Sequence, residues 1–349
     1  MQGKLYAFLG KMLEDKASDL FITAGSPVCE RRGQDVEAMI ADKLTADQAR
    51  ALVQAVYATA GRDLDRLSGQ GDDDFSFAVP DLARFRANVY RQRGSLSAVL
   101  RAVPFDIPDY RTLGIPEAVM DLARLQSGLV VVTGAAGSGK STTQACIIDR
   151  INHTKKRHVV TLEDPIEYLH KNDMSVVSQR EIHLDTGSYG DALRSCLRQS
   201  PDVIYLGEMR DGETIRTAMT AAETGHLVLG TLHTHGTSNT VDRIIDAFPP
   251  EQQHQVRVQL AMVLDTVVFQ QLVQTSNGPV AAFEIMKATP GIRGLIRDAK
   301  THQLDASIQS GQRDGMLSMD ASLNELVRSG RASRDEVLYL MSNPDRLRV

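Results

Sequence analysis

The chain contains no tryptophan and only three cysteines in 349 residues. Cys29, Cys146 and Cys196 are far apart and form no Cys-x-x-Cys pair, so their spacing predicts neither a disulfide framework nor a zinc site. This cysteine usage fits a protein of the reducing cytoplasm best. The composition therefore excludes the class of small secreted domains that depend on disulfides.

Long apolar runs and an excess of positive charge are also missing. No apolar stretch approaches the roughly 18 residues that a membrane-spanning helix needs, and the acidic residues Glu14 and Asp15 come too early for a signal peptide. The formal net charge is −5, which disfavours a nucleic-acid translocase. The one basic run, residues 155–158, is typical of a solvated loop. We therefore expect contact with a membrane only through a partner.

The length predicts about two domains. In the first hundred residues, Thr45 and Gly61 suit the two ends of a helix, and three alternating apolar runs predict an antiparallel meander with turns near Asp81 and Gly94. Prolines then cluster at positions 104, 108 and 116. We expect an N-terminal domain over 1–105, a linker over 106–115 and a second domain over 116–349.

The second domain begins with short apolar runs that alternate with helical patterns. Such runs are typical of parallel strands buried on both faces, and they cover residues 129–133, 158–162, 202–206 and 227–233. The pattern after Pro249 is interpreted as helical, including residues 251–273. We therefore predict an α/β fold with a C-terminal helical subdomain over about 250–349.

The segment "GLVVVTGAAGSGKSTTQA" contains the motif G-x-x-x-x-G-K-S, made by Gly134, Gly139, Lys140 and Ser141. Glycines in such a loop let backbone N–H groups converge on phosphate oxygens, the lysine neutralises phosphate charge, and the serine ligates Mg²⁺. An apolar strand precedes the motif and a helical pattern follows it, which is the context this mechanism requires. The motif therefore predicts a nucleotide-binding site.

Polar residues follow the other apolar runs. Glu163 and Asp164 end the second run, Glu208 follows the third, and His233 ends the fourth. Because parallel sheets bind ligands beyond the carboxyl ends of their strands, we expect these side chains at one edge, beside the phosphate loop. A carboxylate there can orient or deprotonate water, and another group can hold the water shell of a metal.

One position departs from the general pattern of phosphate-loop enzymes. Gly207 precedes Glu208 where many of them have aspartate, so direct metal ligation by an aspartate is excluded at this place. Asp202 stands at the opposite end of the same strand. We expect Asp202 to be structural.

Several segments together resemble a known family. "GAAGSGKSTT", "TLEDPIEYLH", "SPDVIYLGEMRDGETIRTAMTAAETGHLVLGTLHTHG" and "GIRGLIRD" are similar to the phosphate loop, Asp box, Walker B segment, His box and C-terminal retraction motif of the secretion ATPase superfamily. The resemblance is to the retraction ATPases of type IV pili and runs nearly end to end, through "ASDLFITAG" and "DFSFAVPDLARFRANVY".

The resemblance implies a PAS-like α+β domain followed by a RecA-like ATPase domain with a helical tail. It further implies a cytoplasmic homohexameric ring at the inner face of the cytoplasmic membrane, which uses ATP and Mg²⁺ and acts on an inner-membrane pilus platform protein. A paralogous retraction ATPase is a further partner that the family suggests. The implied activity is ATP hydrolysis that powers pilus retraction and twitching motility by movement between the two domains.

Residue roles follow from the same resemblance. Glu163 would be the general base, although either glutamate can serve, while Glu208 would hold Mg²⁺ through water and His226 and His233 would sense the γ-phosphate. Nucleotide-binding positions are implied at Gly134, Gly137, Ser138, Gly139, Lys140, Ser141, Thr142, Arg86, Arg101, Arg194, Arg198 and Arg210. The last three arginines are candidates for contacts with a neighbouring subunit, and for each arginine a solvated or ion-paired side chain is an equal alternative.

The sequence departs from the family pattern in the phosphate loop, and two alternative functions are considered. Ala135 and Ala136 stand where the family usually has proline and threonine, which affects groups beside the phosphates. A pilus assembly or type II secretion ATPase commonly carries a four-cysteine zinc motif, which this chain lacks. A nonhydrolysing regulatory subunit of a mixed ring is disfavoured because both glutamates and both histidines are present.

The retraction motif predicts a helix with two faces. Thr289 and Pro290 suit its first turn, and Ile292, Leu295 and Ile296 form an apolar stripe. Arg293 and Arg297 lie one turn apart on another face, so such a helix can offer paired cations to a partner. An ordinary amphipathic surface helix is the alternative.

Overall fold

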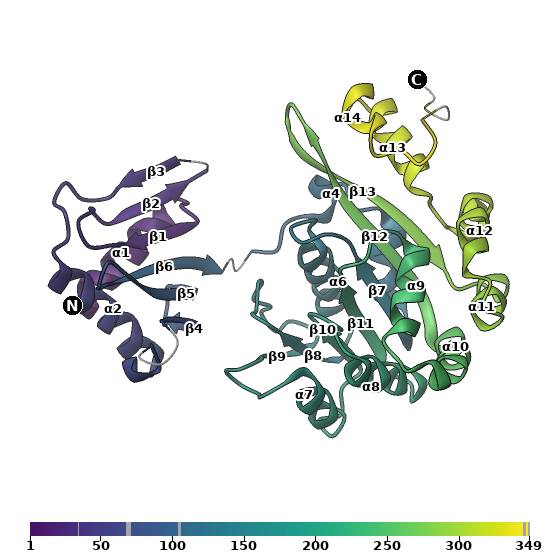
Figure 1. The fold of residues 1–349 in the computed structure, drawn as a ribbon, viewed down its shortest axis with the longest axis horizontal. Coiled ribbons are helices and arrows are strands. Elements are labelled where there is room, and N and C mark those ends of the chain that lie inside the picture. Colours follow the sequence, from purple (N-terminus) through teal and green to yellow (C-terminus); the bar gives the residue numbers. More distant parts are fainter. Residues whose placement is uncertain (34, 68–70, 104–105, 345–346, 348–349) are drawn as a thin grey trace. The chain divides into compact units, whose positions relative to one another are not determined.

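The structure is a computed structural model that describes residues 1–349 except 34, 68–70, 104–105, 345–346 and 348–349. The chain divides into two compact units (Figure 1). The first comprises Met1–Asp106 with Glu167–Leu169, and the second comprises Ile107–Ile166 with His170–Val349. Pro104, the first of the clustered prolines, lies outside the described residues.

The first unit is a mixed sheet-and-helix domain. Its antiparallel sheet has the order β3–β2–β1–β6–β5–β4. The strands are β1 (Asp19–Ile22), β2 (Cys29–Arg32), β3 (Asp35–Ala38), β4 (Asp72–Val79), β5 (Ala83–Gln92) and β6 (Ser95–Val103), and the helices are α1 (Gln2–Glu14), α2 (Ala46–Ala60) and η1 (Leu64–Arg66). The predicted caps are confirmed: Thr45 accepts a hydrogen bond from the N–H of Gln48, and Gly61 ends α2 in the left-handed conformation.

The second unit is built on a mostly parallel sheet with the order β13–β12–β7–β11–β10–β8–β9, in which only the β12–β13 pair is antiparallel among the described strands. The strands are β7 (Gly128–Thr133), β8 (His158–Glu163), β9 (Val176–Glu181), β10 (Val203–Leu206), β11 (Leu227–Leu232), β12 (Leu264–Thr275) and β13 (Gly278–Lys287). The four predicted strands are confirmed as β7, β8, β10 and β11. The strand β9 was not predicted.

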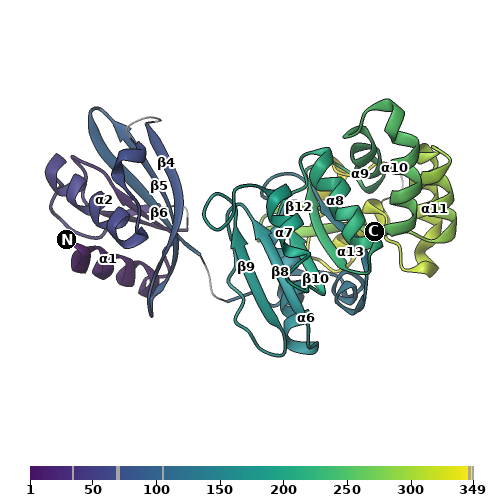
Figure 2. The ribbon, with the colours of Figure 1, turned by 90° about the horizontal axis from the view of Figure 1, so that it is seen from below.

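Helices cover both faces of this sheet. They are α4 (Tyr110–Leu113), α5 (Glu117–Met120), η2 (Asp121–Arg124), α6 (Lys140–Thr154), α7 (Tyr189–Cys196), α8 (Gly212–Glu223), α9 (Thr237–Asp246) and α10 (Pro250–Val263). Val130 and Val132 of β7 belong to the same core cluster as residues of α5 and α6, whereas Val131 belongs to the cluster with residues of α7 to α10. Figure 2 shows the helices of this unit packed around its sheet. This two-sided burial explains why β7 is a continuous apolar run.

The expected helix over residues 251–273 is wrong beyond Val263. There α10 ends, and the chain continues as β12, which pairs with β7 and turns into β13. The run "TVVFQQLV" is rich in β-branched and aromatic residues, which favour strands, and burial on both faces hid its alternation. The C-terminal region is therefore a hairpin within the sheet followed by short helices.

These short helices are α11 (Pro290–Arg297), η3 (Thr301–Gln303), α12 (Leu304–Ser310), η4 (Gly311–Asp314), α13 (Met319–Arg328) and α14 (Arg334–Leu338). The predicted start of α11 is confirmed, because Thr289 accepts from the N–H of Ile292. The expected pair of exposed cations is wrong for Arg293, whose Nη1 donates to the carbonyl oxygen of Met262 at 2.7 Å. This guanidinium caps the negative C-terminal end of α10, which leaves Arg297 more exposed.

Candidate functional site

The phosphate loop connects the end of β7 to the start of α6 over residues 134–139. Gly134 and Gly139 have φ angles of 148° and 88°, which other residues rarely adopt. A β-carbon on Gly134 would also overlap the carbonyl oxygen of Gln270 on β12. The dihedral angle and the neighbouring strand therefore both require glycine at this position.

Two features of the loop suit phosphate binding. Ser138 is buried, and its Oγ has no hydrogen-bond partner among the residues that the structure describes. Such orphaned hydroxyls are rare in folded proteins, and a phosphate oxygen in the loop would supply the missing partner. Ser141 and Thr142 lie in the first turn of α6, where the positive end of the helix dipole favours anions. The residues present thus fit the phosphates of a nucleotide.

Lys140 is the buried cation of this loop and is 7 % exposed. Its Nζ donates to the carbonyl oxygens of Gly134 at 2.9 Å and Ala135 at 2.8 Å, and it lies 3.3 Å from Nδ1 of His233. Because an ammonium group can only donate, Nδ1 of His233 is the acceptor and its Nε2 carries the proton.

His233 links the phosphate loop to the next strand end. Its Nε2 lies 3.3 Å from Oε1 of Glu208, which also accepts from Nε of Arg210 at 2.6 Å. Burial alone would raise the pKa of Glu208, but the bond from Arg210 and the nearby His233 outweigh burial and hold that pKa below its ordinary value. Lys140, His233, Glu208 and Arg210 thus form one connected chain.

Threonines hold the ends of β7 and β11 together beneath this chain. Thr133 Oγ1 lies 2.7 Å from Thr234 Oγ1, and the N–H of Thr234 donates back to Thr133 Oγ1 at 3.0 Å. Thr234 also contacts Thr240 of α9 at 2.7 Å. These bonds fix the backbone next to His233, so the imidazole keeps its position relative to Lys140.

Glu163 lies at the same edge of the sheet, at the end of β8. Its buried carboxylate accepts from Thr161 at 2.6 Å and from Gln179 of β9 at 3.1 Å. In the strand order β7–β11–β10–β8, the strand that ends at Glu163 lies three strand spacings from β7, which is about 14 Å. The strand that precedes Glu208 lies two spacings from β7, which is about 10 Å. Glu163 and Glu208 therefore lie at the carboxyl ends of the parallel strands, as predicted, and Glu208 is nearer to Lys140 than Glu163 is.

His226 is not brought to this edge. It directly precedes β11, whereas His233 directly follows it, and six residues of strand separate the two by about 20 Å. Nδ1 of His226 donates to the carbonyl oxygen of Ala221 at 2.9 Å, at the C-terminal end of α8. Within this chain His226 therefore caps a helix and lies away from Lys140.

Gln270 is a site residue that the sequence interpretation missed. It is buried on β12, and its Oε1 accepts from Thr143 of α6 at 2.7 Å. Its backbone oxygen borders Gly134, and a β-carbon on Gly139 would lie 2.8 Å from its Nε2. Gln270 thus packs against both glycines of the phosphate loop and is hydrogen-bonded to the helix that follows the loop. A polar residue inside the apolar run of residues 267–273 was a usable signal, but the run was interpreted as a helix.

The five predicted arginines lie in two places. Arg86 of β5 and Arg101 of β6 are cross-strand partners in the first unit, and Nε of Arg101 is paired with Asp19 at 2.7 Å. In the second unit, Arg194 of α7 pairs with Asp191 at 2.7 Å, and Arg198 donates to the carbonyl oxygen of Arg194 at 3.3 Å. Arg210 alone of the five joins the Lys140 chain through a described ion pair.

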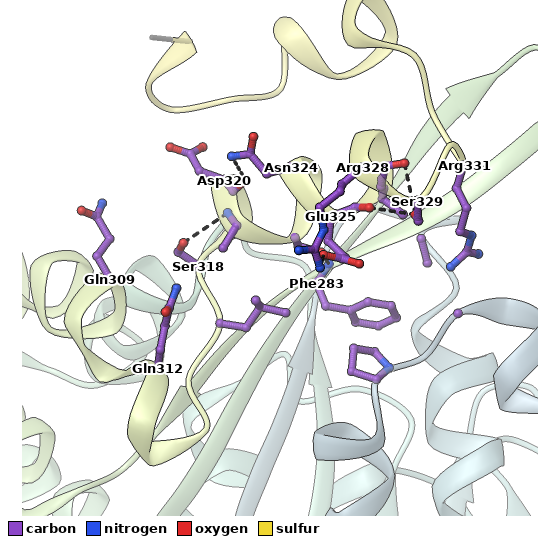
Figure 3. Close-up of a pocket in the computed structure, with 17 residues that line it drawn as sticks. Phe283, Gln309, Gln312, Ser318, Asp320, Asn324, Glu325, Arg328, Ser329 and Arg331 are labelled. Carbon is purple, nitrogen blue, oxygen red and sulfur yellow. Dashed lines mark hydrogen bonds and ion pairs between the residues drawn. The ribbon is translucent and has the colours of Figure 1, made fainter. Parts of the chain in front are cut away.

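Another cavity lies elsewhere in the second unit. It has a volume of about 1200 Å³ and is bordered by α13, β13 and the segment from Gly114 to Pro116 (Figure 3). Figure 3 shows Glu325, Arg328 and Arg331 among its walls. The described residues that line it include none of the strand-end side chains, so we do not place the nucleotide there.

Comparisons with known proteins identify relatives that match most of the chain. The type IV pilus retraction ATPase PilT of Pseudomonas aeruginosa is 44% identical over 334 residues, or 95% of each chain. A twitching motility protein of Neisseria gonorrhoeae is 48% identical over 259 residues, which cover 74% of this chain and 69% of that protein. The crystal structure of the pilus retraction motor PilT with bound ADP matches with a TM-score of 0.88 and 41% identity over 97% of both chains.

The family is settled by the extent of the match. The model of the family described as Type II/IV secretion system protein matches residues 3–341, which includes both units and every strand of the candidate site. No helix within the described residues is long and apolar enough to cross a membrane. The chain belongs to the type II/IV secretion system protein family.

Proposed function

We propose that this chain is an Mg²⁺-dependent ATP-hydrolysing motor that powers type IV pilus retraction. The observation that carries the proposal is the chain of contacts from Lys140 through His233 to Glu208 at the mouth of the phosphate loop. Similarity over 95% of both chains to a pilus retraction ATPase supports the physiological role. The ADP in the structure of a 41% identical retraction motor supports the nucleotide.

The residues of the site have separate roles in ATP hydrolysis. Lys140 exchanges its bonds to Gly134 and Ala135 for phosphate oxygens, which places a positive charge beside the transferred group. Glu208, already bonded to Arg210 and His233, holds water and resists taking a proton. This arrangement favours Glu163 as the general base.

The fit to Mg²⁺ is judged from the donor set. No cluster of three acidic, histidine or cysteine side chains that could cage a metal occurs among the described residues. Mg²⁺ is usually held by phosphates, waters and one or two side chains, so Ser141 and Glu208 are a sufficient protein contribution. When bound, the ion would neutralise charge on the phosphates.

The assembly and its partners are part of the proposal. We infer a homohexameric ring at the inner face of the cytoplasmic membrane, acting on an inner-membrane platform protein and working beside a paralogous retraction ATPase. Arg194, Arg198 and Arg210 are the candidates for contacts with the neighbouring subunit, and Arg86 and Arg101 are the candidate phosphate contacts from the first unit. The exposure of all five side chains is compatible with these roles.

ATP turnover by the purified chain tests the enzymatic part. We expect Mg²⁺-dependent hydrolysis that Lys140→Ala and Glu163→Gln each lower by at least about 100-fold. Lys155→Ala is the matched control, because its Nζ donates to the carbonyl oxygen of Leu125 at the other end of α6. Wild-type turnover no higher than that of Lys140→Ala would favour a regulatory subunit instead.

The phenotype of a deletion strain tests the direction of force. Loss of a retraction motor should leave cells with surface pili but without twitching motility. Loss of an assembly ATPase should leave cells without pili. Complementation with the wild-type gene controls for effects on neighbouring genes, and the Lys140→Ala variant should fail to restore motility because the role depends on ATP.

A further inference from the structure

Gly207, which directly follows β10 and precedes Glu208, has little space for a side chain. A β-carbon there would lie 3.1 Å from the hydroxyl oxygen of Tyr189 and 3.3 Å from both the α-carbon of Glu163 and the carbonyl oxygen of Leu162. The backbone of Gly207 is also held on both sides, because its N–H donates to Leu162 at 2.8 Å and its carbonyl accepts from Thr231.

The group that occupies this space is the Tyr189 hydroxyl. Tyr189 is the first residue of α7, and the side chain of Ser188 caps the helix by accepting from the N–H of Asp191 at 3.2 Å. The Tyr189 ring packs against the core on the α7 face of the sheet. Its hydroxyl therefore reaches the strand ends from a fixed ring.

Three acidic residues, Asp164, Glu208 and Glu163, are close enough for their charges to act on this hydroxyl. Burial raises the pKa of Tyr189 above its ordinary value, and these three negative charges add to the effect, so the hydroxyl keeps its proton. A cavity of about 400 Å³, lined by Tyr189, Asp164 and Arg210 among others, opens beside it. The hydroxyl is thus within reach of water at the hydrolytic edge.

We propose that Tyr189 is a positioning residue for ATP hydrolysis, whose hydroxyl takes the place of an aspartate side chain at residue 207 and orients the carboxylates of Glu163 and Glu208. The inference rests on the proposed function. A hydroxyl both donates and accepts, so it can connect a carboxylate to a water molecule. A neutral group here also avoids a further negative charge beside three acids, which would raise carboxylate pKa values.

The variant Tyr189→Phe tests this role because it keeps the ring and removes only the hydroxyl. We expect kcat for ATP to fall about 3- to 10-fold, the worth of one hydrogen bond, with KM for MgATP within about twofold of wild type. The control is Tyr57→Phe in the first unit, which removes a hydroxyl bonded to Asp73 at 2.9 Å and should leave kcat unchanged. An unchanged kcat in Tyr189→Phe would overturn the inference.

A double-mutant cycle with Gly207→Ala gives a second, independent measure. The added methyl would meet the Tyr189 hydroxyl, so we expect Gly207→Ala to lower kcat more in the wild-type background than in Tyr189→Phe. Additive effects would contradict a shared position. Wild-type turnover no higher than Lys140→Ala would instead remove the proposed function itself, so the two failures are distinguishable.

Discussion

In the sheet of the second unit, the amino ends and the carboxyl ends of the parallel strands carry similar residues with different roles. We call these two sides of the sheet its amino edge and its carboxyl edge. At the amino edge, Arg157 pairs with Asp202 at 2.8 Å, and Asp202 also accepts from the N–H of His158 at 2.8 Å. His226 caps α8 at the same edge. The prediction that Asp202 is structural is thereby confirmed. In the basic run, residues 155–157 form a loop as predicted, but Lys155 and Arg157 are hydrogen-bonded to the rest of the unit.

At the carboxyl edge, a cation, an imidazole, a carboxylate and a guanidinium are connected in series from Lys140 to Arg210. This series of contacts borders the N-terminus of α6 and the buried hydroxyl of Ser138, which has no hydrogen-bond partner among the described residues. The comparison shows that the end of the strand at which a charged residue lies, more than its residue type, indicates whether its role is functional or structural. Carboxyl ends face helix N-termini, where anions bind, whereas amino ends face helix C-termini.

The largest expected effect contrasts the two carboxylates that flank β10, Asp202 before the strand and Glu208 after it. Glu208→Gln should lower ATP turnover about 100-fold and keep nucleotide binding, because it removes charge at the hydrolytic edge. Asp202→Asn, at the other end, should leave turnover within about twofold. Steady-state turnover and the binding of a fluorescent nucleotide measure both. Equal losses of turnover would break the distinction between the edges.

The two histidines that flank β11 give the next test. His233→Ala should lower kcat about 10-fold, because it breaks the link between Lys140 and Glu208. His226→Ala should keep kcat and lower stability by a fraction of the roughly 1 kcal/mol that a hydrogen bond contributes. A larger loss of kcat in His226→Ala would show that its role is not confined to capping α8.

The support beneath the loop gives a smaller effect on affinity. Gln270→Leu removes the acceptor for Thr143 and should raise KM for MgATP about 3- to 10-fold with kcat little changed. Gln271→Leu is the matched control on the same strand, since its side chain points to the opposite face of the sheet. Similar KM values for the two variants would mean that Gln270 does not position the loop.

The smallest effect is expected at the amino edge. Arg157→Ala should lower the free energy of unfolding by about 0.5–1 kcal/mol without changing turnover, because its pair with Asp202 is partly exposed and screened by solvent. Chemical denaturation at low and high salt measures this, and the difference should shrink as salt screens the pair. Arg111→Ala, at a more exposed pair, is the control. A fall in turnover would place Arg157 in the functional machinery.

Much of the hydrolytic edge was predictable from local patterns. The phosphate loop needs its glycines at fixed offsets, and a parallel sheet places Glu208 and His233 at one edge once the strands are found. The caps at Thr45 and Thr289 followed from short-range hydrogen bonds and are confirmed. These features depend on residues that are close in sequence.

What failed depends on contacts between distant segments. β12 lies beside β7 and is buried on both faces, so neither its strand period nor the role of Gln270 was visible in the chain. Arg293 was expected to face a partner because a single helix does not reveal that the end of α10 lies next to it. His226 and His233 look equivalent in "GHLVLGTLH" until the length of the strand between them is known.

By itself the sequence determined the chemical groups, their order along the chain and the strand ends that carry most of them. Only the tertiary structure decided which strands are neighbours, and this order connects Lys140 to Glu208 through His233 and brings the Tyr189 hydroxyl over Gly207. The reason is physical: backbone sterics and hydrogen bonds act over a few residues, whereas sheet order depends on which buried faces pack together.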